Sequence, residues 1–299
     1  MKTLGTNNNF LALEGEHSDF ERSEIAVVSV PYEHTTSYGH GTSQGPESII
    51  EASQQVEFYD EEFDRELCFD KGIATLEPLD LNLKYNSEAL DEIRANIRRL
   101  LDMDKFVVTL GGEHTISQAV IQAHHEKFQD MCILHFDAHS DLRESYEGSE
   151  YSHACVMARV AEFFPTERIT QVGIRAQCAE EAQFIRRKGI TTFYASAIRR
   201  GLHGNNWQRK VAESLTDQVF ITFDVDYFDP SIMPATGTPE PGGFLYSETL
   251  DIFRQMNELD KRIIGFDVVE LAPIKGFHHA DMTAARLAYK MLNFAFAGR

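Results

Sequence analysis

Three side chains of metal-binding type alternate along one short segment of the chain. Asp137, His139 and Asp141 occupy every second position directly after the apolar run Cys132–Phe136. In extended backbone such positions project to one side, so we expect the three side chains to converge on one point. Carboxylate and imidazole groups without any cysteine favour Mn²⁺ over the metals that prefer thiolate. The segment therefore predicts part of a metal site.

Two other strand ends carry the same chemistry. Asp224 and Asp226 follow the apolar run Val219–Phe223, and His114 follows the run Phe106–Leu110. Carboxylates gathered at one edge of a sheet repel one another strongly unless cations lie between them. Six protein ligands, with aspartates available to bridge, suit two ions about 3.5–4 Å apart. The three strand ends together predict a two-metal centre.

Apolar runs that read as strands alternate with longer segments whose apolar residues have helical spacing. Strands that are apolar on both faces are typical of a parallel sheet covered by helices on both sides, so we predict an α/β fold of the doubly wound type. In such sheets ligands bind at the carboxyl ends of the strands, where the clusters above lie. We predict a single domain over residues 1–299, with residues 1–22 as an N-terminal extension. The predicted strands are Ile25–Val30, Phe106–Leu110, Cys132–Phe136, Ile169–Ile174, Val219–Phe223 and Ile263–Phe266, and the predicted helices are Gly45–Val56, Ser87–Leu101, Thr115–Phe128, Ser152–Phe164, Ala179–Lys188, Tyr246–Leu259 and Ala280–Leu292.

The composition excludes several classes of partner. The chain has 28 Lys and Arg against 47 Asp and Glu, a net charge of −19 at pH 7. Nucleic acids and anionic membranes bind basic surfaces, so neither is expected as a partner. The four cysteines are isolated, which predicts neither a zinc ribbon nor a disulfide framework. A polar N-terminus and the lack of an apolar run of about 18 residues favour a cytoplasmic protein.

The segments that carry these residues resemble the signature blocks of the ureohydrolase family, which includes arginases and agmatinases. They are GGEHT, FDAHSD, SHACV, TFDVDYFDPSIMPATGTPEPGG and GFDVVELAP. The blocks follow the family's order from about Pro31 to the C-terminus, and they look most like those of agmatinases. The resemblance implies a three-layer α/β/α arginase-like fold, two Mn²⁺ ions per chain, and hydrolysis of a guanidino compound to urea and an amine.

By motif match, the resemblance also divides the predicted ligands between the two ions. A hydroxide that bridges the ions would attack the guanidinium carbon, and two of the aspartates would bridge as well. The first ion would be held by His114, Asp137, Asp141 and Asp224, and the second by Asp137, His139, Asp224 and Asp226, with Asp137 and Asp224 shared.

Three residues match catalytic groups of the family. Glu270 matches the glutamate that holds the guanidinium nitrogens, and a carboxylate suits this planar fork. Asp141 would carry a proton from the nucleophile to the leaving amine. His153 matches the histidine that shuttles protons, a role that suits the near-neutral pKa of histidine. We also predict that His278 contacts the substrate, because loops at this edge carry specificity.

Two positions bear on which guanidino compound is the substrate. Arg143 and Cys178 stand where arginases have the Asn and Asp that recognise the amino-acid head, so arginine is disfavoured. We predict agmatine, cleaved to putrescine and urea, with the acidic segment from Glu144 to Glu150 attracting its ammonium tail. Arg143 as a substrate-binding residue instead favours guanidinobutyrate or another guanidino acid, and free guanidine is also possible.

A second departure affects the loop before the first helix. Gly39 and Ser43 stand where many agmatinases have two arginines, which bears on substrate choice or on a subunit contact. Family members are commonly trimers or hexamers, so we expect a homo-oligomer whose other partner is a small cationic guanidino compound. The alternative from another class is a catalytically silent metal-binding subunit. A mononuclear zinc deacetylase of similar fold is disfavoured by the paired Asp224 and Asp226.

The remaining histidines are expected to have structural roles. His135, inside a predicted strand, is expected to be buried beside the site and not to bind metal. His124 and His125 are expected on the surface of a helix.

Overall fold

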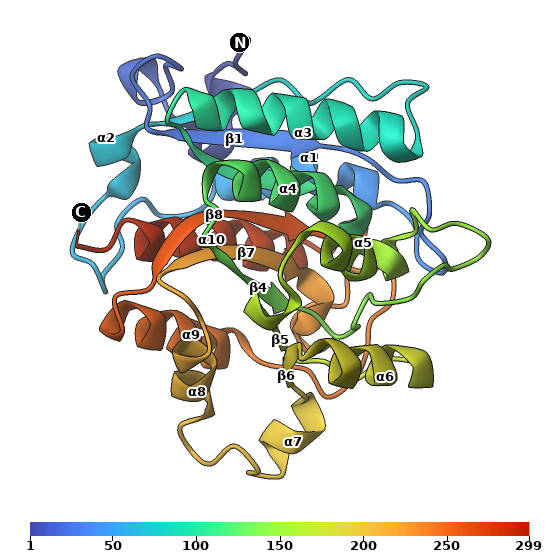
Figure 1. Cartoon of the computed structure of the whole chain (residues 1–299). Coiled ribbons are helices and arrows are strands. Elements are labelled where there is room, and N and C mark those ends of the chain that lie inside the picture. The colour runs from blue at the N-terminus through green and yellow to red at the C-terminus, as the bar shows by residue number, and fades with distance from the viewer. Residues whose placement is uncertain (299) are drawn as a thin grey trace.

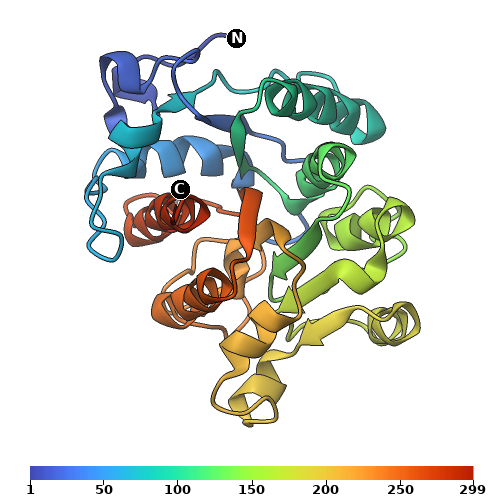
Figure 2. The same cartoon turned by 60° about the vertical axis from the view of Figure 1, so that its left-hand side comes forward.

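The computed structural model describes residues 1–298 and contains one sheet of eight strands. The strand order is β2-β1-β3-β8-β7-β4-β5-β6, and every pairing within the sheet is parallel. Helices cover both faces, which gives three layers (Figures 1 and 2). The predicted α/β class and the arginase-like layering are therefore confirmed. The strands are β1 Ile25–Val30, β2 Ile73–Thr75, β3 Phe106–Gly111, β4 Cys132–Phe136, β5 Ile169–Val172, β6 Thr191–Phe193, β7 Gln218–Asp224 and β8 Arg262–Val269.

One face of the sheet is covered by α1, α8, α9 and α10, and the other by α3, α4, α5 and α6 (Figure 2). Each face has its own apolar core. Helix α3 shows how the sequence builds these layers, because its buried residues Leu90, Ile93, Ile97 and Leu100 recur every three or four positions. The helices are α1 Gly45–Ser53, α2 Leu67–Lys71, α3 Asn86–Asp102, α4 Ser117–Lys127, α5 Val156–Phe163, α6 Ala179–Lys188, α7 Ala195–Arg199, α8 Trp207–Glu213, α9 Tyr246–Glu258 and α10 His279–Ala295.

The strand register brings the predicted functional segments to one edge of the sheet. Leu110 of β3 is aligned with Val268 of β8, Val268 with Phe223 of β7, and Phe223 with Phe136 of β4. These four central strands therefore end at the same level. The residues that follow each of them meet at the carboxyl edge, where ligands bind in open parallel sheets.

Several elements were not predicted. The edge strands β2 and β6 have only three residues each, and α2, α7 and α8 have seven residues or fewer. The N-terminal segment contains short 3₁₀ turns, and its Phe10, Leu11 and Leu13 are buried in the core that includes α1 and α10. All four cysteines are free thiols. No helix among residues 1–298 has the length and apolar character needed to cross a membrane.

His124 corrects one expectation, because it is buried and not on the surface. It belongs to α4, and its ring packs 4.5 Å from the ring of Phe220 in β7. Gly265 of β8 makes this possible, since a Cβ at that position would lie 2.3 Å from His124 Nε2. The helical spacing around His124 was ambiguous because α4 is covered by neighbours on more than one side, α3 and α5 among them.

Burial of His124 predicts a pH-dependent contribution to stability. Burial lowers its pKa to about 4, whereas the unfolded chain binds a proton near pH 6.5. The unfolded state therefore takes up the additional proton, and stability is lost as pH falls from about 6.5 towards 4. Between pH 7 and pH 5 we expect wild type to lose about 2 kcal/mol more unfolding free energy than His124→Gln, measured by urea denaturation. An equal loss in both proteins would contradict this.

Candidate metal centre

The first group of predicted ligands surrounds one ring nitrogen of His114. Nδ1 of His114 lies 3.0 Å from Asp141 Oδ2, 3.2 Å from Asp137 Oδ2 and 3.4 Å from Asp224 Oδ2. All four side chains are buried. His114 follows β3, Asp137 and Asp141 follow β4, and Asp224 is the last residue of β7, so three strand ends supply this group. One cation bound among these four side chains could replace the direct contacts between the ring nitrogen and the carboxylate oxygens.

The second group surrounds His139. Its Nδ1 lies 2.8 Å from Asp226 Oδ2 and 3.5 Å from Asp137 Oδ1. Asp137 therefore turns one oxygen towards each group, as a bridging carboxylate would. Asp224 also faces two ways, because its Oδ2 points at His114 while its Oδ1 accepts a hydrogen bond of 2.8 Å from the backbone N–H of Asp226. All six predicted ligands thus lie together.

The electrostatics of the cluster are those of a site built around positive charge. Burial alone would lower the pKa of His139, but the carboxylates of Asp226 and Asp137 outweigh it and raise that pKa to about 12. Burial also opposes protonation of His114, and its three carboxylate neighbours raise its pKa well above the ordinary value. Burial, Asp226 and Asp137 raise the pKa of Asp224. Without a metal, these side chains would bind protons. Metal cations bound at the same place would displace those protons.

The residues fit a pair of divalent ions. Among residues 1–298 the buried Nδ1 of His114 has no hydrogen-bond partner, although three carboxylate oxygens surround it. Potential metal-binding atoms also converge at Asp137, His139 and Asp226. The donor set of carboxylate oxygens and imidazole nitrogens, without thiolate, suits Mn²⁺. The assignment of individual ligands to each ion stays a prediction.

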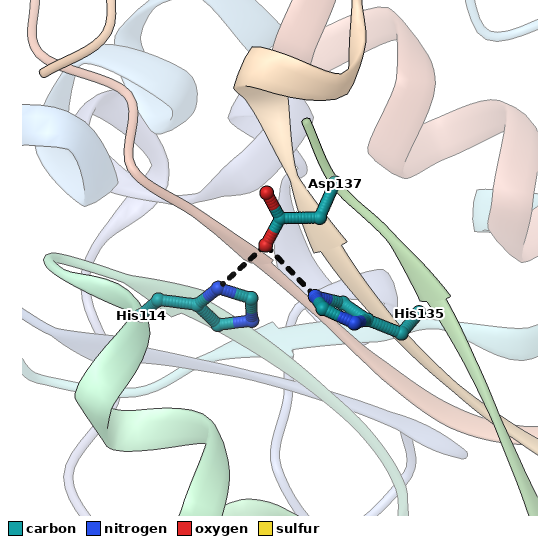
Figure 3. A group of neighbouring side chains, drawn as sticks. All are labelled: His114, His135 and Asp137. Atoms are coloured by element: carbon teal, nitrogen blue, oxygen red, sulfur yellow. Dashed lines mark hydrogen bonds and ion pairs between the residues drawn. The ribbon is translucent and has the colours of Figure 1, made fainter. Parts of the chain in front are cut away.

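His135 lies beside Asp137 and supports it. Figure 3 shows Asp137 between His114 and His135, and the Nε2 of His135 lies 2.8 Å from Asp137 Oδ2. The side-chain amide of Gln171 donates to Nδ1 of His135 at 3.1 Å and to the Ser140 carbonyl at 2.9 Å. Because Nδ1 accepts, Nε2 carries the hydrogen and donates it to Asp137. His135 is buried, as expected, and acts as a donor to a predicted ligand.

His114 has similar support on its other nitrogen. Its Nε2 lies 3.0 Å from the hydroxyl of Thr222, which in turn donates to Asp267 Oδ1 at 2.8 Å. The chain of contacts leaves Nδ1 facing the carboxylates. Sequence reasoning missed Thr222, Asp267 and Gln171, although Asp267 stands three residues before Glu270 in a segment already singled out.

Two predicted catalytic residues have unusual backbone conformations. Asp141 and Glu270 have φ values of 54° and 65°, in the left-handed region that non-glycine residues rarely occupy. Such conformations cost free energy and cluster at functional sites. Only glycine fits at position 112, because a Cβ there would lie 1.9 Å from the Tyr32 carbonyl oxygen. The Glu270 side chain accepts a hydrogen bond of 2.6 Å from the His114 backbone N–H.

A cleft of about 270 Å³ opens on the cluster. The three predicted catalytic residues, four of the six predicted metal ligands and Arg143 line it. They are His139, Asp141, Arg143, His153, Asp224, Asp226 and Glu270.

The structure does not bring His278 to this cleft. Its side chain is 87% exposed, and its nearest ionic neighbour is Asp281 at 3.9 Å. His278 is the N-cap residue directly before α10, and its ring extends into solvent there. Substrate contact by His278 is therefore unsupported by its position.

Arg143 lines the cleft, but its guanidinium group already lies near two neighbouring side chains. Its Nε lies 3.9 Å from Glu181, and its guanidinium lies 5.0 Å from the ring centre of Tyr146. The acidic segment next to it, which was predicted to attract an ammonium tail, does not face the cleft. Glu144 and Glu150 instead lie 3.4 and 3.3 Å from Arg159, and no residue from Glu144 to Glu150 other than Tyr146 lines the cleft.

The loop that lacks the two arginines packs closely on the cleft. The backbone N–H of Gly39 donates to the Gly237 carbonyl at 3.0 Å, and a Cβ at Gly39 would lie 2.8 Å from that oxygen. Ser43 donates from its backbone and its hydroxyl to Glu33. An arginine at position 39 would require the backbone to move. The local packing therefore suits glycine and not the arginine that many agmatinases have there.

Most of the chain is similar to proteins of one known family. The family model described as "Arginase family" matches residues 23–293. The chain belongs to the arginase family. This confirms the resemblance seen in the motifs, and it makes the protein a member of a family of ureohydrolases.

Named relatives within the arginase family have related activities. The chain is 41% identical to N(1)-aminopropylagmatine ureohydrolase from Synechocystis sp. over 93% of its length and 90% of that protein. It is 34% identical to agmatinase from Bacillus cereus, with 92% and 93% covered. Among solved structures, agmatine ureohydrolase of Thermoplasma volcanium has a TM-score of 0.80 at 27% identity, covering 98% of this chain and 96% of that one. Proclavaminate amidino hydrolase from Streptomyces clavuligerus shares the fold, with a TM-score of 0.87 at 24% identity and 98% of both chains covered.

Proposed function

We propose that this ureohydrolase is a manganese enzyme that hydrolyses a guanidino compound with a cationic amine tail, releasing urea and the free amine. Agmatine, cleaved to putrescine and urea, is the simplest such substrate. The observation that carries the proposal is a cluster of six metal-type side chains, four of which line one cleft together with Glu270 and His153. We propose two Mn²⁺ ions per chain and assembly as a homo-oligomer, in keeping with the family.

The proposed roles follow from charge and position. His114, Asp137, Asp141 and Asp224 would hold one ion, and Asp137, His139, Asp224 and Asp226 the other. Bound there, the ions would supply a nucleophile at neutral pH, because divalent ions lower the pKa of the water that they bind.

The chain's own residues would orient the substrate and move protons. Glu270 accepts hydrogen bonds from the planar guanidinium, which sets the carbon facing the metal cluster. Asp141 passes a proton towards the leaving amine, and His153 exchanges protons with solvent at the mouth of the cleft.

The charges beyond the metal cluster favour a cationic tail. Glu181 lines the cleft, but its oxygens already accept hydrogen bonds from the backbone N–H groups of Leu142 and Cys178 at 3.0 and 2.6 Å. Glu240 also lines the cleft, and no cationic side chain of residues 1–298 lies within 4.0 Å of its carboxylate. Arg175 donates to the Glu240 backbone carbonyl at 2.8 Å and thereby anchors this segment. Glu240 is thus available to an ammonium group.

A second candidate substrate is N(1)-aminopropylagmatine. The specific observation is that relatives with that activity in their names reach 41% and 38% identity, whereas the agmatinase from Bacillus cereus reaches 34%. This substrate has the same guanidino group as agmatine and a longer cationic tail, and its hydrolysis would release urea and spermidine. It would use the same cluster and the same Glu240.

A panel of substrates tests the proposal. Urea release by the Mn²⁺-loaded protein would be measured with agmatine, N(1)-aminopropylagmatine, arginine, guanidinobutyrate, guanidinopropionate and guanidine. We expect the two amine-tailed compounds to have the highest kcat/KM, with the aminopropyl compound at least equal to agmatine. Urea from none of them would refute the enzyme and favour a silent metal-binding subunit. A preference for guanidinobutyrate would assign the tail contact to Arg143.

Glu240→Gln is expected to weaken binding of amine-tailed substrates. Loss of one charge-assisted hydrogen bond costs on the order of 1 kcal/mol, so KM for agmatine should rise about fivefold with kcat nearly unchanged. KM for guanidinobutyrate should not rise, because its tail is anionic. Glu147→Gln removes the same charge from a position outside the cleft and is the matched control. An equal rise in KM in both variants would show that only the overall charge matters.

A further inference from the structure

The hydroxyl of Thr35 joins the predicted proton shuttle to a buried carboxylate. Thr35 lies in the loop after β1, and its Oγ1 is 2.9 Å from Glu113 Oε1. The same oxygen lies 2.9 Å from the backbone N–H of His153 and 3.3 Å from its ring Nδ1. A hydroxyl has one hydrogen to donate and two lone pairs to accept with. These three contacts therefore use its whole hydrogen-bonding capacity.

The partners determine the direction of each hydrogen bond. Glu113 is fully buried, and its other oxygen, Oε2, accepts from the backbone N–H groups of His34 and Thr35 at 2.7 and 2.6 Å. Because Glu113 accepts, the Thr35 hydrogen points at its Oε1. The hydroxyl then accepts from the His153 backbone, and its remaining lone pair requires a hydrogen on Nδ1 of His153. The ring therefore carries its hydrogen on Nδ1.

This tautomer leaves the other ring nitrogen of His153 ready to take a proton. No group in residues 1–298 hydrogen-bonds to Nε2 of His153, and His153 lines the cleft above the metal cluster. We propose that Thr35, oriented by Glu113, is a positioning residue that holds His153 in the Nδ1–H form and turns Nε2 towards the cleft. This inference rests on the proposed function, in which His153 moves a proton.

The proposed arrangement follows a known physical logic. A carboxylate behind an imidazole selects the tautomer and stabilises the imidazolium that forms when the free nitrogen takes a proton. Here the hydroxyl of Thr35 stands between the two groups and transmits both effects. When Nε2 has accepted a proton, the Nδ1 hydrogen keeps its bond to Thr35, and the charge of Glu113 faces the new cation through that hydroxyl.

Variants of Thr35 test the proposal through a split between kcat and KM. Thr35→Val keeps the branched shape but removes the hydroxyl, and it is expected to lower kcat for urea release about 10- to 100-fold with KM within about twofold. Thr35→Ser keeps the hydroxyl and should restore most of kcat. Thr36→Val is the matched control, since the Thr36 hydroxyl contacts His40 at 2.8 Å and not His153. Unchanged kcat in Thr35→Val, with a normal rate in wild type, would overturn the proposal.

A double-mutant cycle and a direct measurement separate positioning from a general structural role. In a His153→Gln background, Thr35→Val should have no further effect on kcat, because Thr35 acts through His153. An equal loss in both backgrounds would contradict this. Nitrogen-15 NMR of the histidine-labelled chain, with His153 assigned by its loss in His153→Gln, should show a protonated Nδ1. A protonated Nε2 alone would refute the inference even if wild type released no urea, an outcome that would refute the proposed function separately.

Discussion

Asp226→Ala is expected to retain one Mn²⁺ ion per chain instead of two and to lose urea release by at least about 10³-fold. Asp226 is 2% exposed, and its Oδ2 lies 2.8 Å from His139 Nδ1. Its Oδ1 accepts a hydrogen bond of 2.9 Å from the backbone N–H of Ala138. Alanine removes both oxygens from the group around His139 but none from the group around His114. The rate would fall because, in the proposed function, both ions together would activate the attacking water.

The matched control for this variant is Asp217→Ala. Asp217 lies just before the other end of the same strand, β7, and its side chain is 94% exposed. The Asp217→Ala variant should keep two ions and the wild-type kcat. Metal content would be measured by inductively coupled plasma mass spectrometry. Two Mn²⁺ ions in Asp226→Ala would show that the ligand assignment is wrong. One ion with undiminished urea release would show that a single ion suffices.

The long strands were predictable because each carries a local signal of its own. The strands β1, β4, β7 and β8 are buried on both faces along nearly their whole length, so their sequences are mostly apolar. The strands β2 and β6, with three residues at the two edges of the sheet, are too short to show a period. The strand order was also beyond local patterns. Strand β8 lies between β3 and β7, and its pairing with β3 joins segments that are more than a hundred residues apart in the sequence.

The metal cluster was predictable for a similar reason. Asp137 and His139 stand at alternate positions after one strand, so their convergence follows from backbone geometry. Contacts between distant segments could not be predicted in this way. The pairing of Glu144 with Arg159, and the approach of Thr35 to His153 across 118 positions, depend on how loops fold over the sheet edge. His124 shows a different failure, since this polar helix residue was assigned to the surface although its side chain is buried against Phe220 of β7 and Gly265 of β8.

Glu270→Gln is expected to keep both metal ions and to lose roughly 30- to 1,000-fold in kcat/KM. Loss of one partner from a buried charged pair costs about 2–4 kcal/mol, which sets this range. Burial raises the pKa of Glu270, and its Oε1 accepts from the His114 backbone N–H at 2.6 Å. Glutamine can keep that hydrogen bond with its carbonyl oxygen. Its amide nitrogen would then present N–H groups to the N–H groups of the guanidinium, so the substrate loses an acceptor and meets a competing donor.

Metal content and kinetics together distinguish this role from that of a ligand. Asp226→Ala should lose an ion, whereas Glu270→Gln should not, so equal metal loss in both would make Glu270 part of the metal site. The whole panel of guanidino substrates should be affected to a similar extent, because Glu270 would contact the group that all of them share. Glu240→Gln, by contrast, should affect only those with an amine tail. If Glu270→Gln changed the preference between agmatine and guanidinobutyrate instead, Glu270 would face the tail and the proposed orientation of the substrate would be reversed.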